Sequence, residues 1–422
     1  MKKATYTPAA VRVVCGLILA FTAVRFIYLV VKFHWTVSPG DFLGGYILAL
    51  IVREGLNFYD PASVATVMKM MHLDPTDPTM IPKMFLTHIP LYHVTKIPFT
   101  FFSFPLALLL WRLFLLATLG LTGYLFMRAI HSGWSWEWIG IICLIFLSGR
   151  PIPWALKIGN SVFLLLCLLT AVWWAHQRDR PWLTGALLGL SVMFKLVPLI
   201  LIPLFLIKRH YQTVVATLTT VLGLILLNQL LVGGSATSEW LFSVKVYHDY
   251  VLHRPYQINA ISLVHKLLGG ARPTLAYGVG AGAMFALYAV SLFICSRRGG
   301  PLSIGEYATV VALVPICSPY VYPIHLVLLV FPLLATAHIL MESERFPGFR
   351  WGVFTIVWLA WALGFYYFRW ADEASFGLKS LLGYVPLFSA IGLWGLLLSC
   401  IGTRPAESIM DKPSPSEITL RS

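Results

Sequence analysis

Charged side chains are scarce in this sequence of 422 residues: they make up 11% of it, whereas a soluble domain carries about 25%. Acidic residues are the scarcer kind, with 17 Asp and Glu against 31 Lys and Arg, and 58% of the residues are apolar. No water-soluble fold of this size can bury that much apolar surface. The sequence therefore predicts a polytopic protein of the lipid bilayer. Its apolar runs are long and continuous rather than alternating, which favours helices over a closed barrel.

Closely spaced pairs of cysteine are also missing. The six cysteines lie far apart in apolar stretches: Cys15, Cys143, Cys167, Cys295, Cys317 and Cys400. This spacing suggests neither a disulfide framework nor a zinc site, and it leaves the redox compartment open.

Several signatures of known chemistries are absent as well. There is no glycine-rich phosphate loop and no serine nucleophile elbow, which argues against nucleotide hydrolysis and against serine-based acyl transfer. His and Asp do not occur at metal-ligand spacing within one segment. The prolines beside Asp74 and Asp77 favour a turn there over a cation site. The basic residues are dispersed between apolar segments, which disfavours nucleic-acid binding.

Long apolar segments are what the sequence has in abundance, and the long ones approach the roughly 20 residues that cross hydrocarbon. We expect membrane helices over about 9–31, 103–127, 134–149, 160–176, 181–194, 196–207, 211–232, 274–295, 306–318, 322–340, 351–368 and 382–400. The first is too long for the apolar part of a signal peptide, so we expect it to be retained. The predicted fold is an all-α bundle of about twelve transmembrane segments over 1–402. A disordered cytoplasmic tail over 403–422 follows.

The net charge of +14 indicates the orientation of the bundle. Most short links between the segments are basic, and such links are cytoplasmic by the positive-inside rule. The residues concerned are Arg128, Arg178, Arg180, Lys208, Arg209, Arg297, Arg298, Arg345 and Arg350. Both termini are then cytoplasmic, and the long segments 32–102 and 233–273 face outward. A second interpretation, compatible with the first, is that some of these cations meet anionic lipid headgroups or a lipid phosphate.

One stretch does not fit a simple series of crossings. The links at 177–180 and 207–210 are both basic, yet only one short apolar stretch separates them, so a single crossing would place one link outside. Two short helices that turn near Lys195 keep both links inside, and such broken helices are tolerated where they line a cavity in the protein. We also expect an amphipathic helix over 62–73 that lies on the outer membrane surface.

Asp41 is the most informative single residue. It follows the first span, in a loop rich in glycine and aromatics at the membrane surface, where a charge is costly and rarely kept without use. A carboxylate there can act as a general base toward a hydroxyl. It can also cap a helix, since Pro39 and Gly40 precede it and an apolar run follows. The two roles are compatible.

Two further residues at helix breaks are candidates for binding an anion. Lys195 either snorkels to the interface or provides a cation for a phosphate, with Pro198 fixing the bend. His325 follows Pro319 and Pro323, which break the helix and direct the histidine at a cavity. The alternative for His325 is a packing role within an apolar run.

Three polar residues and two arginines complete the candidates. Asn259 and Ser262 lie on one side of a short predicted helix and either bind substrate or cap that helix. Asn160 opens the fourth span and is equally open to both interpretations. Arg25 and Arg112 lie within apolar spans, where they meet a lipid phosphate or pair with an internal acid or carbonyl.

Taken in order, these segments resemble a known family. The matching residues are Asp41, Tyr46, Gly55, Tyr59, Asp60 and Pro61; Thr87 to Tyr92; Gly159 and Asn160; Gly189, Leu190, Lys195 and Pro198; Asn259, Ser262 and Leu263; and Ser318, Pro319 and His325. The chain is similar to the bacterial membrane glycosyltransferases of the GT-C superfamily that include the polyprenol-phosphate-mannose-dependent mannosyltransferases acting on phosphatidylinositol mannosides. His88 stands near a usual aromatic and Asn160 replaces a Gln. These departures bear on the sugar and the acceptor more than on the reaction.

The resemblance implies an enzyme of the bacterial inner (cytoplasmic) membrane with an extracytoplasmic active site, active in cell-envelope biosynthesis. It would move mannose or another sugar from a polyprenyl-phosphate donor to an envelope lipid or glycan by an inverting displacement, without a metal or a further cofactor. Asp41 would be the general base, and Lys195 and His325 would hold the donor phosphate. The implied substrate-binding residues are Tyr46, Tyr59, Asp60, His88, Asn160, Asn259 and Ser262. Two other functions stay open: a transporter or flippase of lipid-linked saccharides, which needs no general base, and a scaffold subunit of an envelope-building complex.

Overall fold

The computed structural model describes residues 16–17, 19–28, 31, 40–57, 60–74, 89–130, 135–233, 238, 257–268, 272–342, 347–373 and 381–401, with side chains up to 363 in the range 347–373. Every regular element in these residues is a helix, which confirms the all-α class. The proposed tail over 403–422 lies outside the described residues.

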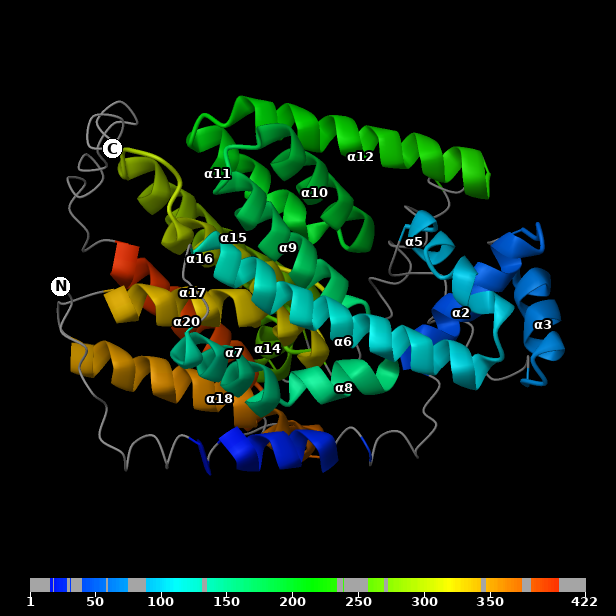
Figure 1. The fold of residues 1–422 in the computed structure, drawn as a ribbon, viewed down its shortest axis with the longest axis horizontal. Helices are drawn as coiled ribbons and strands as arrows, with labels where there is room; N and C mark the ends of the chain where they lie inside the picture. The colour runs from blue at the N-terminus through cyan, green and yellow to red at the C-terminus, as the bar shows by residue number, and fades with distance from the viewer. Residues whose placement is uncertain are drawn as a thin grey trace, which may run out of the picture.

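Four of the helices, α6, α12, α17 and α18, run roughly along the long axis of the molecule, whereas others cross it obliquely (Figure 1). Their bounds are α2 Gly40–Arg53, α3 Pro61–Met70, α5 Leu91–Val94, η1 Ile97–Phe101, α6 Phe104–Ala129, α7 Trp136–Ser148, α8 Pro151–Ile158, α9 Val162–His176, α10 Pro181–Phe194, η2 Val197–Ile200, α11 Leu201–Ile207, α12 Tyr211–Val232, α14 Ala260–Leu267, α15 Pro273–Arg297, α16 Ile304–Ile316, η3 Pro323–Leu329, α17 Val330–Glu342, α18 Pro347–Glu373 and α20 Val385–Ile401. A further apolar helix covers Leu19–Tyr28.

Only some of these helices satisfy the length and composition of a membrane span. Within the described residues, α6, α12, α15 and the continuous pair η3–α17 do so, and a fifth span results if α7 and α8, bent by 61°, count as one. The chain is thus a multi-pass membrane protein, but a count of twelve spans is not confirmed. Many of the other predicted segments are helices of 10 to 17 residues, shorter than the roughly 20 needed.

Two local predictions need correction. Asp41 does not lie in a loop, because α2 begins at Gly40 and carries Asp41 in its first turn. The alternative prediction, that Asp41 stands at the start of a helix, agrees with this position, because the apolar run that follows continues the helix through the glycines. The helix α8 was not predicted either. Pro151 and Pro153 open it, a position that proline tolerates because the first helical N–H groups need no partner in the helix.

The span formed by η3 and α17 lies at the centre of the bundle. It is the most apolar of the four spans and almost wholly buried. It packs against α7, α9, α16, α18 and α20, and Phe331 makes an edge contact with Phe126 of α6. A helix that is apolar on all sides belongs in such a position, since no face of it is suited to water.

The break predicted at Lys195 is present. α10 ends at Phe194, Lys195 is extended with φ −159° and ψ 143°, and the chain resumes as η2 and α11. His176, at the end of α9, and His210, just after α11, have ring centroids 4.7 Å apart. The basic links at 177–180 and 207–210 therefore lie at the same end of the bundle, as two short helices turning near Lys195 require.

Glycines allow α10 to approach α12 closely. A Cβ atom on Gly185 would collide with the carbonyl of Thr213, and one on Gly189 would lie 2.6 Å from Cβ of Thr220 and 2.9 Å from the carbonyl oxygen of Thr217. Small residues four apart are a common device for packing helices in membranes, because they let the backbones approach. This contact fixes the helix that ends at Lys195.

We expect Gly189→Ala to lower the stability of the protein by about 1–3 kcal/mol, because the added methyl group overpacks the contact with α12. The matched control is Gly223→Ala, where no atom lies within 4 Å of the added carbon. That variant gains helix propensity and should be unchanged or slightly more stable. Thermal unfolding of the two purified variants in the same detergent tests this, and equal melting temperatures would contradict the packing argument.

Candidate active site

The N-terminus of α2 docks on the C-terminus of α8, and this contact places Asp41. Gly40 has φ +52°, and a Cβ atom there would lie 2.7 Å from backbone atoms of Ile158. Gly159 ends α8 with φ +68°, and a Cβ atom on it would lie 2.6 Å from Cβ of Phe42. A side chain at either glycine would force the two helix ends apart. Both glycines therefore serve a close approach as well as a backbone conformation that favours glycine.

Asn160 joins the two helix ends to a third. Its Nδ2 donates to Oδ2 of Asp41 at 2.5 Å, and its Oδ1 accepts from the backbone N–H of Val162 at 2.8 Å. One amide side chain thus holds the carboxylate and caps the first turn of α9, so both interpretations of Asn160 are compatible with the structure. Asp41 remains exposed to solvent and sits in the first turn of α2, where the helix dipole favours negative charge.

Helix α6 holds the C-terminal end of α8, on which α2 docks, through three side-chain hydrogen bonds. Nε1 of Trp111 donates to the carbonyl of Gly159 at 2.8 Å, and Arg112 donates to the carbonyls of Leu156 and Lys157 at 3.1 and 2.7 Å. Arg112 therefore satisfies orphan carbonyls at a helix end. Arg25 likewise donates to the carbonyl of Ser148. Of the alternatives for these two arginines, the structure shows the carbonyl contacts.

Lys195 and His325 meet across the bundle. Their Nζ and Nε2 atoms lie 2.7 Å apart, although the residues are 130 positions apart in sequence. Nδ1 of His325 accepts from the backbone N–H of Tyr322 at 3.1 Å, so in the neutral imidazole the hydrogen resides on Nε2. At this distance the Nε2–H donates to Nζ of Lys195, which accepts it as a neutral amine and keeps its own N–H groups as donors. N–H donors of this kind suit an anionic oxygen.

Lys96 is a residue of this region that the sequence analysis did not place in the site. It is 1% exposed, although it is a lysine. Its Nζ donates to the hydroxyl of Tyr92 at 2.8 Å and lies 4.0 Å from the centre of the Tyr92 ring and 5.5 Å from that of Trp111. Gly45 of α2 packs on this side chain, and any Cβ atom there would collide with Nζ. The aromatic cage replaces part of the hydration that the ammonium group loses.

The charges of these groups act on one another. The carboxylate of Asp41 interacts electrostatically with the side-chain amines of both Lys96 and Lys195. Burial lowers the pKa of Lys96 to about 7, and the charge of Asp41 partly opposes that effect. The hydroxyl of Tyr92, whose pKa burial raises, also interacts with Ser161, the neighbour of Asn160. Asp41, Lys96 and Lys195 therefore form one electrostatic unit at one end of the bundle.

The spacing of Tyr92 and Lys96 could have revealed this second lysine. The two residues are four apart in a short apolar segment, the distance at which side chains meet on one helical face. The lysine stands out less than Lys195 because the surrounding segment was assigned to an outward loop. Burial of a loop residue depends on the packing of α2, which the sequence does not show.

Other predicted site residues have structural partners. The hydroxyl of Tyr46 donates to the carbonyl of Phe102 at 2.8 Å inside an aromatic cluster. Asp60 is the N-cap of α3 and accepts from Ala62 N–H at 3.0 Å. Neither is brought to Asp41 by these contacts. Tyr59 and His88 lie outside the described residues.

Asn259 and Ser262 form a reciprocal capping box at the start of α14. Nδ2 of Asn259 also donates to the carbonyl of Pro319 at 2.5 Å, and Tyr384 donates to the hydroxyl of Ser262 at 3.2 Å. The pair thus attaches α14 to the segment that leads to His325. Its predicted contact with substrate remains untested.

No group of three or more His, Cys, Asp and Glu side chains suited to a metal ion occurs in the part of the chain that the structure describes.

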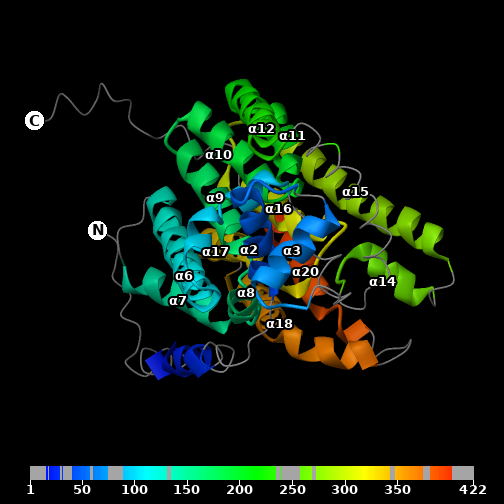
Figure 2. The same ribbon diagram turned by 90° about the vertical axis from the view of Figure 1, so that its right-hand side faces the viewer.

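The chain is a multi-pass membrane protein whose polar groups gather where several helices end. Figure 2 shows α2 and α3 at this end, in front of α8, α9 and α16. The model of Glycosyltransferase family 87 matches residues 87–319, just over half of the chain. The chain therefore belongs to glycosyltransferase family 87, a GT-C-like family of membrane glycosyltransferases. Neither the curated proteins nor the solved structures gave a match.

The matched region contains Lys96, Asn160 and Lys195, whereas Asp41 and His325 lie on either side of it. The structure joins the two outer residues to the matched region through the contacts with Asn160 and Lys195. The family match thus covers three of the site residues, and the fold brings Asp41 and His325, which lie outside the match, into contact with them.

We expect Lys96 to make stability depend on pH. Its pKa is about 7 in the folded protein and about 10.4 in the unfolded chain, so between these values the unfolded chain binds more protons. The free energy of unfolding should therefore rise with pH across this window, by up to about 1.4 kcal/mol per pH unit from this group. Below pH 7 its contribution becomes constant.

Thermal unfolding of the purified protein in non-ionic detergent between pH 6 and pH 10 measures this dependence. The difference between the wild type and Lys96→Met isolates the contribution of Lys96 from other titrating groups. Lys69→Met, on an exposed face of α3, is the control and should follow the wild type. Parallel curves for the wild type and Lys96→Met would contradict a depressed pKa at this site.

Proposed function

We propose that this glycosyltransferase moves a sugar from a polyprenyl-phosphate donor to a hydroxyl of an envelope lipid or glycan, with Asp41 as the general base. The observation that carries the proposal is an exposed carboxylate within electrostatic reach of two lysines, one of which contacts His325, at one end of the bundle. A displacement at an anomeric carbon needs these two functions together: a base for the incoming hydroxyl and cations for the departing phosphate. A transporter of lipid-linked saccharides needs no base, and the family membership also favours the transferase.

The proposed transfer is a single displacement at the anomeric carbon of the sugar. Asp41 takes the proton of the acceptor hydroxyl, and the acceptor oxygen forms a bond to the anomeric carbon of the sugar. The bond between that carbon and the phosphate oxygen breaks, and its electron pair leaves with the polyprenyl phosphate. Because attack and departure occur on opposite faces, the configuration inverts. Mannose or another hexose or pentose fits this scheme equally.

Asn160 contributes by orienting the base. Its amide bond to Oδ2 fixes the carboxylate while leaving the group exposed to an acceptor. Lys195 and His325 would receive the phosphate, since their nitrogens meet at one point and an anionic oxygen that enters there can take the place of the contact between them. Lys96, buried beneath α2, adds a charge at longer range and needs no contact with substrate.

The length of α9 supports an extracytoplasmic reaction. Asn160 lies before the start of α9 and the basic link 177–180 follows its end, and a helix of 15 residues is about 22 Å long. The reactive end and the basic end of the bundle are thus separated by much of a hydrocarbon layer of roughly 30 Å. If the basic links are cytoplasmic by the positive-inside rule, the site faces outward. Lipid-linked sugars, rather than nucleotide sugars, are donors on that side.

Asp41→Asn should abolish most of the transfer, because the amide cannot accept the proton; a general base contributes typically 10²–10⁴-fold to rate. The assay uses membranes supplied with radiolabelled polyprenyl-phosphate mannose and the lipid extract of the host, followed by separation of the labelled lipids. The matched control is Asp179→Asn in the basic link. Asp179 has a positive φ of 51°, which Asn also adopts readily, so that variant should retain full activity. Retained turnover in Asp41→Asn, with normal folding, would remove Asp41 as the base.

Lys195→Met and His325→Gln should each reduce transfer by about 10²–10³-fold, because each removes one donor to the departing phosphate. If the two residues hold the same phosphate, the double variant should lose little more than either single variant. Rates with saturating donor and acceptor measure this for all three proteins. Losses that multiply in the double variant would show that the residues act independently.

A further inference from the structure

The chain is broken between α16 and η3, directly before His325. Helix α16 ends at Ile316, and residues 317–322, which include Pro319, lead to η3. A helix that is interrupted in a membrane protein loses backbone hydrogen bonds, and other partners must replace them. The partners of residues 317–322 therefore decide how firmly His325 is held beside Lys195.

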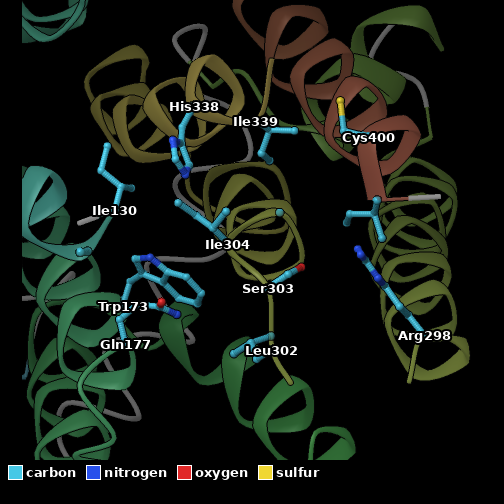
Figure 3. Close-up of a pocket in the computed structure, with 13 residues that line it drawn as sticks. Ile130, Trp173, Gln177, Arg298, Leu302, Ser303, Ile304, His338, Ile339 and Cys400 are labelled. Carbon is cyan, nitrogen blue, oxygen red and sulfur yellow. The ribbon is translucent and has the colours of Figure 1, made fainter. Parts of the chain in front are cut away.

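Contacts at the opposite end of α16 are too remote to hold this break. Ser303 and Glu306 form a capping box there, and Glu306 lies 2.6 Å from Nζ of Lys208. Figure 3 shows Ser303 and Ile304 beside a hollow of about 290 Å³. A helix of 13 residues, about 20 Å long, separates that end from the break. The break must be held by contacts of its own.

Gln257 and the two residues that follow it supply these contacts. Oε1 of Gln257 accepts from the backbone N–H of Val321 at 3.2 Å, and the N–H of Ile258 donates to the carbonyl of Val321 at 2.9 Å. Asn259 donates to the carbonyl of Pro319. Both backbone groups of Val321 are therefore bonded to a segment that lies 64 positions earlier in the chain.

The bonds to Val321 act on the peptide unit that sets the tautomer of His325. The carbonyl of Val321 and the N–H of Tyr322 belong to one planar unit. The carbonyl accepts from Ile258, and the N–H donates to Nδ1 of His325 at 3.1 Å. Hydrogen bonds linked in this way polarise and strengthen one another. The proton of the neutral imidazole then resides on Nε2, the nitrogen that lies 2.7 Å from Nζ of Lys195.

The side-chain oxygen is the part of Gln257 that the fold uses. The side chain is 2% exposed, and its Oε1 accepts a second hydrogen bond, from Nδ2 of Asn259 at 3.2 Å. Its Nε2 has no hydrogen-bond partner among the described residues. Exchange of the oxygen and nitrogen would turn a donor toward two N–H groups, so the network fixes the orientation of the amide.

We infer that Gln257 is a positioning residue for the transfer: its side-chain oxygen holds Val321 and, through the next peptide unit, keeps His325 in the tautomer whose Nε2–H faces Lys195. The inference deepens the proposed function and rests on it, because His325 would hold the departing phosphate from that position. Gln257 itself needs no contact with substrate, since protein encloses its side chain.

Nitrogen NMR of the full chain, labelled with ¹⁵N-histidine and held in non-ionic detergent at pH 8 without substrates, tests this role. The signals of His325 are those absent from His325→Gln. In the wild type, Nδ1 should be unprotonated and Nε2 protonated. Gln257→Met keeps the length of the side chain and removes an orphaned donor, so it should fold. It should lower the preference for this tautomer about fivefold, since one hydrogen bond is lost, and move the two signals toward each other.

Two variants serve as matched controls. Gln257→Glu keeps an accepting oxygen and should retain the wild-type signals. Tyr384→Phe removes the hydrogen bond to Ser262 in the same junction, leaves Val321 untouched and should also retain them. A proton on Nδ1 in the wild type, unchanged signals in Gln257→Met, or the same change in Gln257→Met and either control would overturn the inference.

Transfer from the polyprenyl-phosphate donor provides a second readout. Gln257→Met should lower kcat about fivefold and leave the KM for the acceptor unchanged, because the acceptor hydroxyl meets Asp41. In a His325→Gln background, Gln257→Met should cause no further loss, since its effect passes through His325. Losses that multiply would contradict the inference. Full activity in His325→Gln would instead remove the proposed role of His325 in the transfer, while the tautomer measurement decides separately whether Gln257 holds that histidine.

Discussion

The hydrogen bond from Asn160 to Asp41 is the contact on which the candidate site depends. It joins α2, which follows the first apolar segment, to the turn between α8 and α9 in the middle of the chain. Two glycines make the bond possible by letting the helix ends touch. The same amide closes the first turn of α9, so the geometry of the base and the start of a buried helix are fixed by one side chain.

Burial strengthens the electrostatic interaction of the lysines with Asp41. A charge in a site of low dielectric acts more strongly on its neighbours than one in water. Lys96 is held between an aromatic ring and a glycine, and Lys195 stands at the break between two helices. Both remain within electrostatic reach of Asp41, which is itself exposed. The arrangement separates an exposed acid from one lysine that is fully buried, Lys96, and one that is half-buried, Lys195.

Much of the fold and of the candidate site could be predicted from the sequence, and the predictions that were wrong or incomplete have physical reasons. The break at Lys195 followed from charge alone, because two basic links had to share one side. The meeting of Lys195 with His325 could be suspected from the proline-broken segments but required the fold to bring residues 130 positions apart together. Asp41 was singled out by its type and place, and of the two settings predicted for it, a loop and the start of a helix, the structure shows the start of a helix. Lys96 was missed because burial in a connecting segment depends on tertiary packing. The capping box of Asn259 and Ser262 was one of two open alternatives, since the same residue types serve caps and ligands.

The span Pro323–Glu342 has a consequence for how the protein enters the bilayer. It has the highest hydropathy of the four spans, although nearly all of it ends up against protein rather than lipid. Its apolar character therefore serves the moment of insertion, when the helix first meets lipid alone, as well as the packed state. Helices α7, α9 and α16 precede it in the chain, whereas α18 and α20 follow. Until α18 and α20 have been synthesised and inserted, the side of this span that they cover in the folded protein therefore faces lipid.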